Sequence, residues 1–329
     1  MKKCFTLLLV CALLLGGCAP APASENSVVG FYFDTVVMLS GYCEERVLKD
    51  ALESCAGYER LFSKNIEGSD VWRINHANGQ AVQVGAETLG LLKLALEISE
   101  ASGGAFDVSI GRAAALWDFM AESPVLPDPA ALADAAASAD YRRIRIENDS
   151  VSIPADMQLD LGGIAKGYIS ARIAEQLRAA GVKSALLDFG GNMVAIGTKP
   201  GDFPWSIGIE DPDAPHQNIL LRFGCVDGAV VTSGDYERCF MLDGVRYHHI
   251  LDVHSGMPVH NGVRQFTVIS ADAAKADALS TACFALGAEK GLALCERYGA
   301  QGICVLEDGS IRTSEAFHEN GVVMFNVRP

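Results

Sequence analysis

The sequence has little positive charge: 26 lysine and arginine residues stand against 41 aspartate and glutamate residues, which gives a net charge of −15 over 329 residues. No segment is rich in lysine or arginine, so we expect no nucleic-acid partner. Internal repeats and low-complexity linkers are also missing, which argues against repeat architectures. The composition is that of an ordinary globular protein, with half of the residues apolar. A chain of this length can bury the core of one large domain or two moderate ones.

The first eighteen residues have the pattern of an export signal. Lys2 and Lys3 precede an apolar run at 4–15, which is too short to span a bilayer, and the run ends in Gly-Gly-Cys at 16–18. This segment resembles a bacterial lipoprotein signal, a resemblance that implies lipidation of Cys18 as the first mature residue. An ordinary secretory signal with a chance cysteine is the alternative.

These features predict three parts of the chain. We expect residues 1–17 to be a signal peptide, residues 18–28 a lipidated cysteine with a short tether, and residues 29–326 the folded domain. The protein is then an extracytoplasmic lipoprotein of the cell envelope that reaches the membrane through lipid on Cys18.

Seven of the ten cysteines lie beyond residue 18, and none of them forms a CxxC pair. Most have apolar neighbours, so we expect buried free thiols and neither a zinc site nor a disulfide framework.

Apolar periodicity predicts an α+β fold, because helices and strands alternate without the regular order of a parallel sheet. Helical spacing is present at 44–61, 86–102, 129–139, 165–180 and 273–286. Strand patterns are present at 28–39, 142–147, 158–161 and 184–187, throughout 205–269, and at 302–306 and 322–327.

Residues 159–168 (LDLGGIAKGY) predict a strand that passes through paired glycines into a helix. Glycines let a ligand approach the backbone, and the N-terminus of a helix favours a phosphate. Lys166 can add a charged contact. The segment matches neither a Walker A loop nor GxGxxG, and a tight turn without a ligand is the alternative.

The predicted helix at 273–286 places Asp277 and Thr281 on one face, four residues apart. A carboxylate and a hydroxyl are oxygen ligands that Mg²⁺ accepts together with substrate phosphates. We expect Asp277 to be partly exposed, so that its replacement leaves the fold intact. A solvated aspartate beside a threonine that bonds to its own helix is the alternative.

Three of the seven histidines fall within residues 247–256 (YHHILDVHSG). A regular strand would put His248 and His254 on one face and His249 on the other, so a clustered metal site is not expected. A Ser-His-Asp hydrolase triad is not expected either, because the chain lacks GxSxG.

Residues 102–107 (SGGAFD) can present backbone groups and the carboxylate of Asp107 to a ligand. Capping of the helix that follows is the alternative role for Asp107.

Seven segments in this order resemble the ApbE family of FAD:protein FMN transferases: SGGAFDVSIG with LWDF, LDLGGIAKGY, DFGGN followed by AIG, WSIGIEDP, VVTSGDYER, DGVRYHHILDVHSGMPV and ADALSTACFALG. The resemblance covers about residues 29–324. It implies an α+β fold of two intimately packed lobes, dependence on Mg²⁺, and FAD as the donor. It also implies transfer of FMN to a Thr or Ser hydroxyl of a target protein, an envelope redox protein, with release of AMP.

The resemblance assigns roles to residues of this chain. It implies metal ligands at Ala165, through its carbonyl, and at Asp277, Ser280 and Thr281. It implies His249 as the group that activates the acceptor hydroxyl or orients phosphate, with Asp252 as its orienting partner. The remaining residues are implied to contact FAD: Asn65, Ala105, Phe106, Asp107, Gly162, Lys166, Tyr168 and Leu251.

Two positions depart from the family pattern. Many relatives carry tyrosine where Asn65 stands, and His248 stands where serine or threonine commonly precedes the histidine. A small polar side chain in place of an aromatic one opens the site to water. We therefore keep two alternatives to transfer: an Mg²⁺-dependent FAD pyrophosphatase that yields FMN and AMP, and a non-enzymatic flavin-binding lipoprotein.

Overall fold

The computed structural model describes residues 24–317 and 322–324, with side chains described up to residue 317. Its helices are α2 (Glu45–Phe62), α3 (Asp70–Asn75), α4 (Ala86–Ala101), α5 (Gly111–Ala114), α6 (Pro129–Ala137), the 3₁₀ turn η1 (Tyr141–Arg143), α7 (Ala165–Ala179), α8 (Ala273–Leu286) and α9 (Ala288–Arg297). Its strands are β1 (Asn26–Tyr32), β2 (Thr35–Gly41), β3 (Val82–Gln83), β4 (Arg145–Glu147), β5 (Ser150–Ser152), β6 (Ala185–Phe189), β7 (Asn192–Ile196), β8 (Trp205–Glu210), β9 (Ile219–Val226), β10 (Ala229–Gly234), β11 (Cys239–Leu242), β12 (Val245–His248), β13 (Val263–Ser270), β14 (Gln301–Leu306), β15 (Ile311–Thr313) and β16 (Val322–Met324).

The largest element is an eight-stranded sheet in the order β1-β2-β6-β7-β10-β13-β14-β15, and every neighbouring pair is antiparallel. Three smaller sheets accompany it, in the orders β16-β9-β8, β3-β5-β4 and β11-β12. Antiparallel strands with helices packed on one side are an α+β arrangement, as the sequence predicted.

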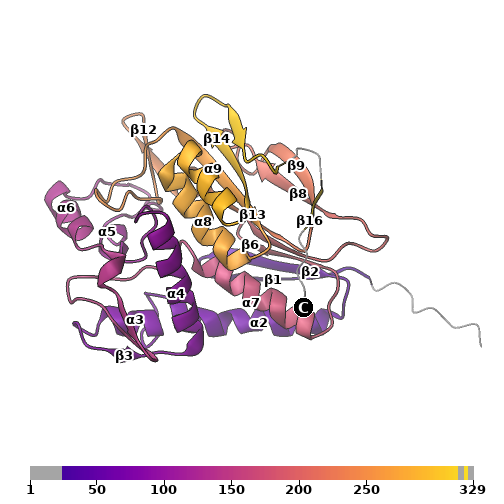
Figure 1. Cartoon of the computed structure of the whole chain (residues 1–329), viewed down its shortest axis with the longest axis horizontal. Helices are drawn as coiled ribbons and strands as arrows, with labels where there is room; N and C mark the ends of the chain where they lie inside the picture. The colour runs from indigo at the N-terminus through magenta and orange to yellow at the C-terminus, as the bar shows by residue number, and fades with distance from the viewer. Residues whose placement is uncertain (1–23, 318–321, 325–329) are drawn as a thin grey trace, which may run out of the picture.

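The two faces of the large sheet are covered differently. Helices α2, α7 and α8 pack on one face, where Leu48, Ile173 and Leu279 belong to the main core. The small sheet β8-β9-β16 packs on the other face, where Ile207 and Phe223 belong to a second core. Figure 1 shows α8 and α9 against the strands, with β8, β9 and β16 on the opposite side. Because apolar side chains alternate along the central strands, each strand contributes to both cores.

The predicted helices are confirmed, and the bounds of α8 coincide with the predicted 273–286. Helices α3 and α9 were not predicted. The strand pattern at 28–39 corresponds to β1 and β2, which form a hairpin at the edge of the large sheet. Of the strand expected at 322–327, β16 covers 322–324, and the rest lies outside the described residues.

The strand predicted at 158–161 is wrong, because only a single bridge from Gln158 to Ile110 forms there. The side-chain amide of Asn75 takes the place of a neighbouring strand: it accepts from Leu159 N at 2.7 Å and donates to Leu159 O at 3.0 Å. A buried backbone segment can satisfy its polar groups in this way without joining a sheet.

The seven cysteines beyond residue 18 are free thiols, as predicted, and five of them are buried, whereas Cys43 and Cys239 are half-buried. The predicted signal peptide and most of the predicted tether lie outside the described residues. Among residues 24–317 and 322–324, no helix has the length and apolar character required to cross a membrane.

Candidate active site

Asp277 is the carboxylate around which the candidate site is built. It lies on the face of α8 that packs against α7, and only 3% of its surface is exposed. Its Oδ2 accepts from Gly167 N at 2.7 Å, and its Oδ1 accepts from Asn192 Nδ2 at 3.0 Å. The expectation that Asp277 is partly exposed is therefore wrong: this carboxylate joins α7, α8 and the start of β7.

Gly167 allows the two helices to meet at this carboxylate. A Cβ atom at position 167 would overlap Cβ of Asp277 and the carbonyl oxygen of Ala273. The last glycine of LDLGGIAKGY is thus required for close helix packing, while the paired glycines form the turn before α7. The turn approaches α8 as well, because a Cβ on Gly163 would lie 3.4 Å from Thr281 Oγ1 and 3.2 Å from the ring of Phe106.

Three hydroxyl groups lie together between α8 and the end of β10, close to the backbone of Asp277. Ser280 Oγ donates to Asp277 O at 2.8 Å and lies 2.8 Å from Ser233 Oγ at the end of β10. Thr281 Oγ1 lies 3.3 Å from Ser233 Oγ and 3.5 Å from Gly163 O. Ser233 was not among the predicted site residues, although the motif VVTSGDYER contains it. Its position at the end of a strand was the signal that could have found it.

Ala165 is the first residue of α7, and its N–H donates to Leu161 O at 2.9 Å. The hydrogen bonds of Thr281 Oγ1 reach two backbone oxygens, those of Gly163 and Asp277, each at 3.5 Å. The role of the Ala165 carbonyl stays a prediction.

The segment at 105–107 follows α4 and turns through two glycines with positive φ. Phe106 is buried and faces the paired glycines, whereas Ala105 is half-buried. Both carboxylate oxygens of Asp107 are bound within the protein, one by the N–H and hydroxyl of Ser109 and the other by Tyr141 N. Burial raises the pKa of Asp107 above its usual value, against the lowering effect of these bonds.

Asp107 therefore shapes its own loop. The alternative role as a helix cap is wrong, because the cap of α5 is Ile110. Any contact with FAD from this segment has to come chiefly from its backbone and from Phe106.

Tyr168 points away from Asp277. Its hydroxyl donates to Glu87 at 3.0 Å and accepts from Arg172 at 3.1 Å, and its ring packs edge-on against Phe62. Gly90 of α4 leaves room for this hydroxyl. The structure places Tyr168 among α2, α4 and α7, and its contact with FAD stays a prediction.

The loop that carries Asn65 is tied to the glycine turn by an ion pair. Lys64 Nζ lies 2.6 Å from Asp160 Oδ2, and Asp160 Oδ1 accepts from Gly162 N at 2.8 Å. Burial acts to raise the pKa of Asp160, but Lys64, the Gly162 N–H and Arg238 together hold it below its usual value. Asn65 itself is exposed. The exposed loop and the glycine turn are thus neighbours although about a hundred residues separate them.

The two adjacent histidines have different environments. His248 ends β12 and is buried, with Nε2 at 3.0 Å from Val259 O, and burial lowers its pKa to about 4. His249 is exposed, and its N–H donates to Arg238 O at 3.1 Å. Desolvation by nearby protein, followed by the positive charge of Lys166, lowers the pKa of His249 below its usual value. His249 is therefore a neutral, accessible imidazole on which the positive charge of Lys166 acts.

Asp252 was expected to orient the imidazole of His249, but its side-chain hydrogen bonds go to another residue. The carboxylate of Asp252 accepts from the N–H and the hydroxyl of Ser255, at 2.8 and 2.7 Å, within a turn. Leu251 is buried in a small cluster with Trp117 and Phe240. The strand also ends at His248, so the alternation expected to reach His254 does not continue.

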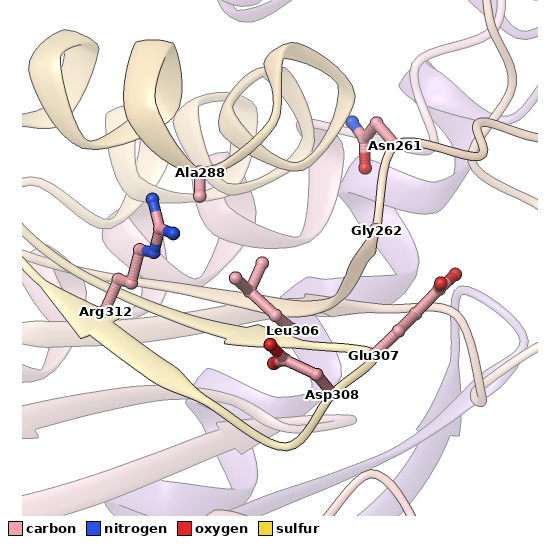
Figure 2. Close-up of a pocket in the computed structure, with 7 residues that line it drawn as sticks. All are labelled: Asn261, Gly262, Ala288, Leu306, Glu307, Asp308 and Arg312. Atoms are coloured by element: carbon pink, nitrogen blue, oxygen red, sulfur yellow. The ribbon is translucent and has the colours of Figure 1, made fainter.

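A cavity of about 390 Å³ lies elsewhere on the protein, between α9 and the β14-β15 hairpin. Figure 2 shows Arg312 extending beside Ala288, with Asn261, Leu306, Glu307 and Asp308 around the opening. None of the predicted site residues lines this cavity. This cavity is therefore not part of the candidate site.

The fold and the site define a class of protein: an α+β enzyme that gathers carboxylate and hydroxyl oxygens beside a glycine turn and a helix N-terminus, a combination suited to phosphate groups. The model of the ApbE family matches residues 31–305. An FAD:protein FMN transferase of Treponema pallidum is 36% identical over 93% of this chain and 92% of its own length. One from Klebsiella pneumoniae is 36% identical over 82% of this chain and 86% of its own.

Solved structures agree with these matches. The ApbE protein of Thermotoga maritima superposes with a TM-score of 0.82 at 35% identity, over 89% of this chain and 98% of its own. The flavinyl transferase ApbE of Pseudomonas stutzeri in its apo form superposes with a TM-score of 0.80 at 29% identity, over 91% of this chain and 97% of its own. The chain belongs to the ApbE family, and it is an enzyme of flavin transfer.

Proposed function

We propose that this enzyme transfers FMN from FAD to a Thr or Ser hydroxyl of a target protein as a phosphoester and releases AMP, with Mg²⁺ as the metal. The observation that supports it best is the cluster of Asp277, Ser280, Thr281 and Ser233 at the glycine turn. A carboxylate and hydroxyls that can hold a metal ion, next to a helix N-terminus, are groups that stabilise the charge of phosphoryl transfer.

The residues fit Mg²⁺ by the chemistry of their donors. Among the residues that the structure describes, no three His, Cys, Asp or Glu side chains gather as a metal site. One carboxylate with neutral oxygens is nevertheless typical of Mg²⁺, which keeps waters and takes its other ligands from substrate phosphates. Asp277 and Thr281 would hold the ion with a backbone carbonyl of the glycine segment, and Ser280 would assist. The ion would stabilise negative charge on the phosphate oxygens.

Side chains of the protein are proposed to receive the proton of the acceptor hydroxyl and to orient the phosphate. The acceptor oxygen forms a bond to the flavin-side phosphorus, the pyrophosphate P–O bond breaks, and AMP leaves with the bonding electrons. His249 is the group assigned to take the hydroxyl proton or to orient the phosphate, and its lowered pKa leaves the imidazole neutral at pH 7. Lys166, whose Nζ lies 3.5 Å from Gly162 O, adds positive charge at the glycine turn.

The proposal is tested with the purified mature chain, FAD, Mg²⁺ and envelope extract. We expect fluorescent flavin-labelled protein bands, a mass increase of one FMN less one water on the labelled protein, and an equal amount of AMP. FAD that stays intact would favour the flavin-binding lipoprotein. AMP and free FMN without labelled protein would favour the pyrophosphatase.

Asn65 favours hydrolysis as a companion activity, because its exposed, small side chain leaves the loop beside Asp160 open to water. We expect Asn65→Tyr to lower AMP release in the absence of acceptor by about tenfold, a loss in the range that water exclusion and stacking provide. Transfer should fall less, since a bound acceptor covers the phosphorus itself. AMP release is measured with and without acceptor at saturating Mg²⁺.

The control is Ile66→Tyr, which adds the same ring at the next exposed position of the loop. Equal hydrolysis by wild type and Asn65→Tyr would show that Asn65 does not control the entry of water.

We also propose that the enzyme is an extracytoplasmic lipoprotein anchored through Cys18. Cys18→Ala is expected to abolish incorporation of labelled fatty acid and to move the mature protein out of the membrane fraction, since the lipid chains provide the anchor. Cys43→Ala, at a half-buried cysteine of the domain, is the control. Fatty-acid labelling of Cys18→Ala at the wild-type level would contradict the assignment.

A further inference from the structure

The β1-β2 hairpin carries an apolar surface that no other described element covers. Val29, Phe31, Val36 and Met38 are 62%, 68%, 56% and 37% exposed. Val29 pairs with Met38 and Phe31 with Val36 across the hairpin, so the four side chains share one face. We call these four residues the hairpin patch. Side chains of this size rarely gather in the open without a partner.

The patch is the uncovered remainder of a sheet face. Farther along the same sheet, the small sheet β8-β9-β16 packs over β7, β10, β13 and β14. It leaves the β1-β2 end uncovered, and β1 is the terminal strand in the order of the large sheet. An edge strand with an open apolar face is suited to contact with another polypeptide.

One end of the patch leads to the candidate active site. The turn of the hairpin is held there by Arg238, whose Nη2 lies 3.4 Å from Asp34 O. The backbone oxygen of Arg238 also accepts from His249 N at 3.1 Å, so the same residue joins the hairpin turn to the candidate site. A protein bound to the patch would therefore sit next to the imidazole and the glycine turn.

The other end of the patch is polar. Ser40 Oγ donates to Ser27 Oγ at 3.0 Å, and the hydroxyl of Tyr42 donates to Glu25 at 3.0 Å. This end is the one nearest the proposed lipid tether. If the patch served to contact the bilayer, apolar side chains should be concentrated at the tether end, but they are concentrated at the end beside the site.

We propose that the hairpin patch is the docking surface for the protein that accepts the flavin, which contacts it with apolar side chains. This inference rests on the proposed function, because a transferase must hold a whole protein while one hydroxyl reaches the phosphorus.

The test uses the double variant Phe31→Thr/Val36→Thr, which removes apolar surface and keeps strand-forming residues. We expect the KM for the acceptor to rise about fivefold or more, the range found for central apolar contacts of an interface. The kcat for transfer and the acceptor-independent hydrolysis of FAD should stay unchanged. Phe203→Thr and Ile311→Thr remove exposed apolar side chains at other places and serve as controls.

An unchanged acceptor KM in the double variant overturns the inference while the transferase activity stands. The same holds if the variant loses only binding to phosphatidylcholine vesicles, or only self-association in analytical ultracentrifugation. Absence of any labelled protein with the wild-type enzyme rejects the proposed function, and the docking surface with it. A benzophenone attached at Phe31→Cys should crosslink to the flavin-labelled acceptor.

Discussion

Replacement of Asp277 by asparagine is expected to lower Mg²⁺-dependent FAD turnover about 100-fold or more, because the charged ligand of the proposed metal site is lost. The amide keeps the shape of the carboxylate, and its oxygen can still accept from Gly167 N. Asn192 can turn its amide to match the new group. The melting temperature should therefore stay within a few degrees of the wild-type value while activity is lost.

Asp277→Ala should differ from Asp277→Asn in stability. Alanine leaves Gly167 N and Asn192 Nδ2 without their acceptor in a buried place, at a cost of about 1–3 kcal/mol for each group. Both variants should be inactive, but only the alanine variant should unfold at clearly lower urea concentration.

The control is Asp272→Ala, which removes the side-chain cap of the same helix and costs about 1 kcal/mol of stability. It should keep its turnover with FAD and Mg²⁺. Full Mg²⁺-dependent activity in Asp277→Asn would show that the metal is bound elsewhere.

The helices were predictable because their signals are local. Helix α8 begins after Asp272, whose side chain accepts from Ala274 N and Lys275 N, and it ends at Gly287 with positive φ. A cap and a glycine are visible in the sequence. The wrong strand at 158–161 has a different cause. Its apolar residues Leu159 and Leu161 are buried, but Asn75, 84 residues from Leu159, bonds to the backbone in place of a neighbouring strand.

Within the candidate site, the proximity of residues on one element was predictable, and their contacts with distant segments were not. Asp277, Ser280 and Thr281 lie together because one helix carries them. The partners that complete the site come from distant segments: Ser233 is 47 residues from Ser280, and Lys64 is 96 residues from Asp160. No local pattern contains such distances. The burial of Asp277 escaped prediction for the same reason, since it depends on α7, which lies 110 residues earlier at Gly167.

The second large effect is expected at Gly167, where α7 and α8 are in contact. Local propensity favours alanine in a helix by about 1 kcal/mol. Tertiary packing opposes it, because the added methyl group would overlap Asp277 Cβ and Ala273 O. Because Ala273 O is a backbone atom, it cannot move aside as a flexible side chain can. Helix α7 must therefore move away from α8, which stretches the hydrogen bond from Gly167 N to Asp277. We expect Gly167→Ala to lower the free energy of unfolding by about 3 kcal/mol or more and to abolish FAD turnover.

Gly57→Ala is the matched control for this prediction. Gly57 lies inside α2, and a Cβ at that position meets no atom within 4 Å. The same substitution should there raise the free energy of unfolding by about 0.5–1 kcal/mol. Urea titration of both variants therefore gives changes of opposite sign if contact between α7 and α8 is what requires Gly167. A gain of stability in Gly167→Ala would mean that the helices can separate at no cost, and that the position of Asp277 does not depend on this glycine.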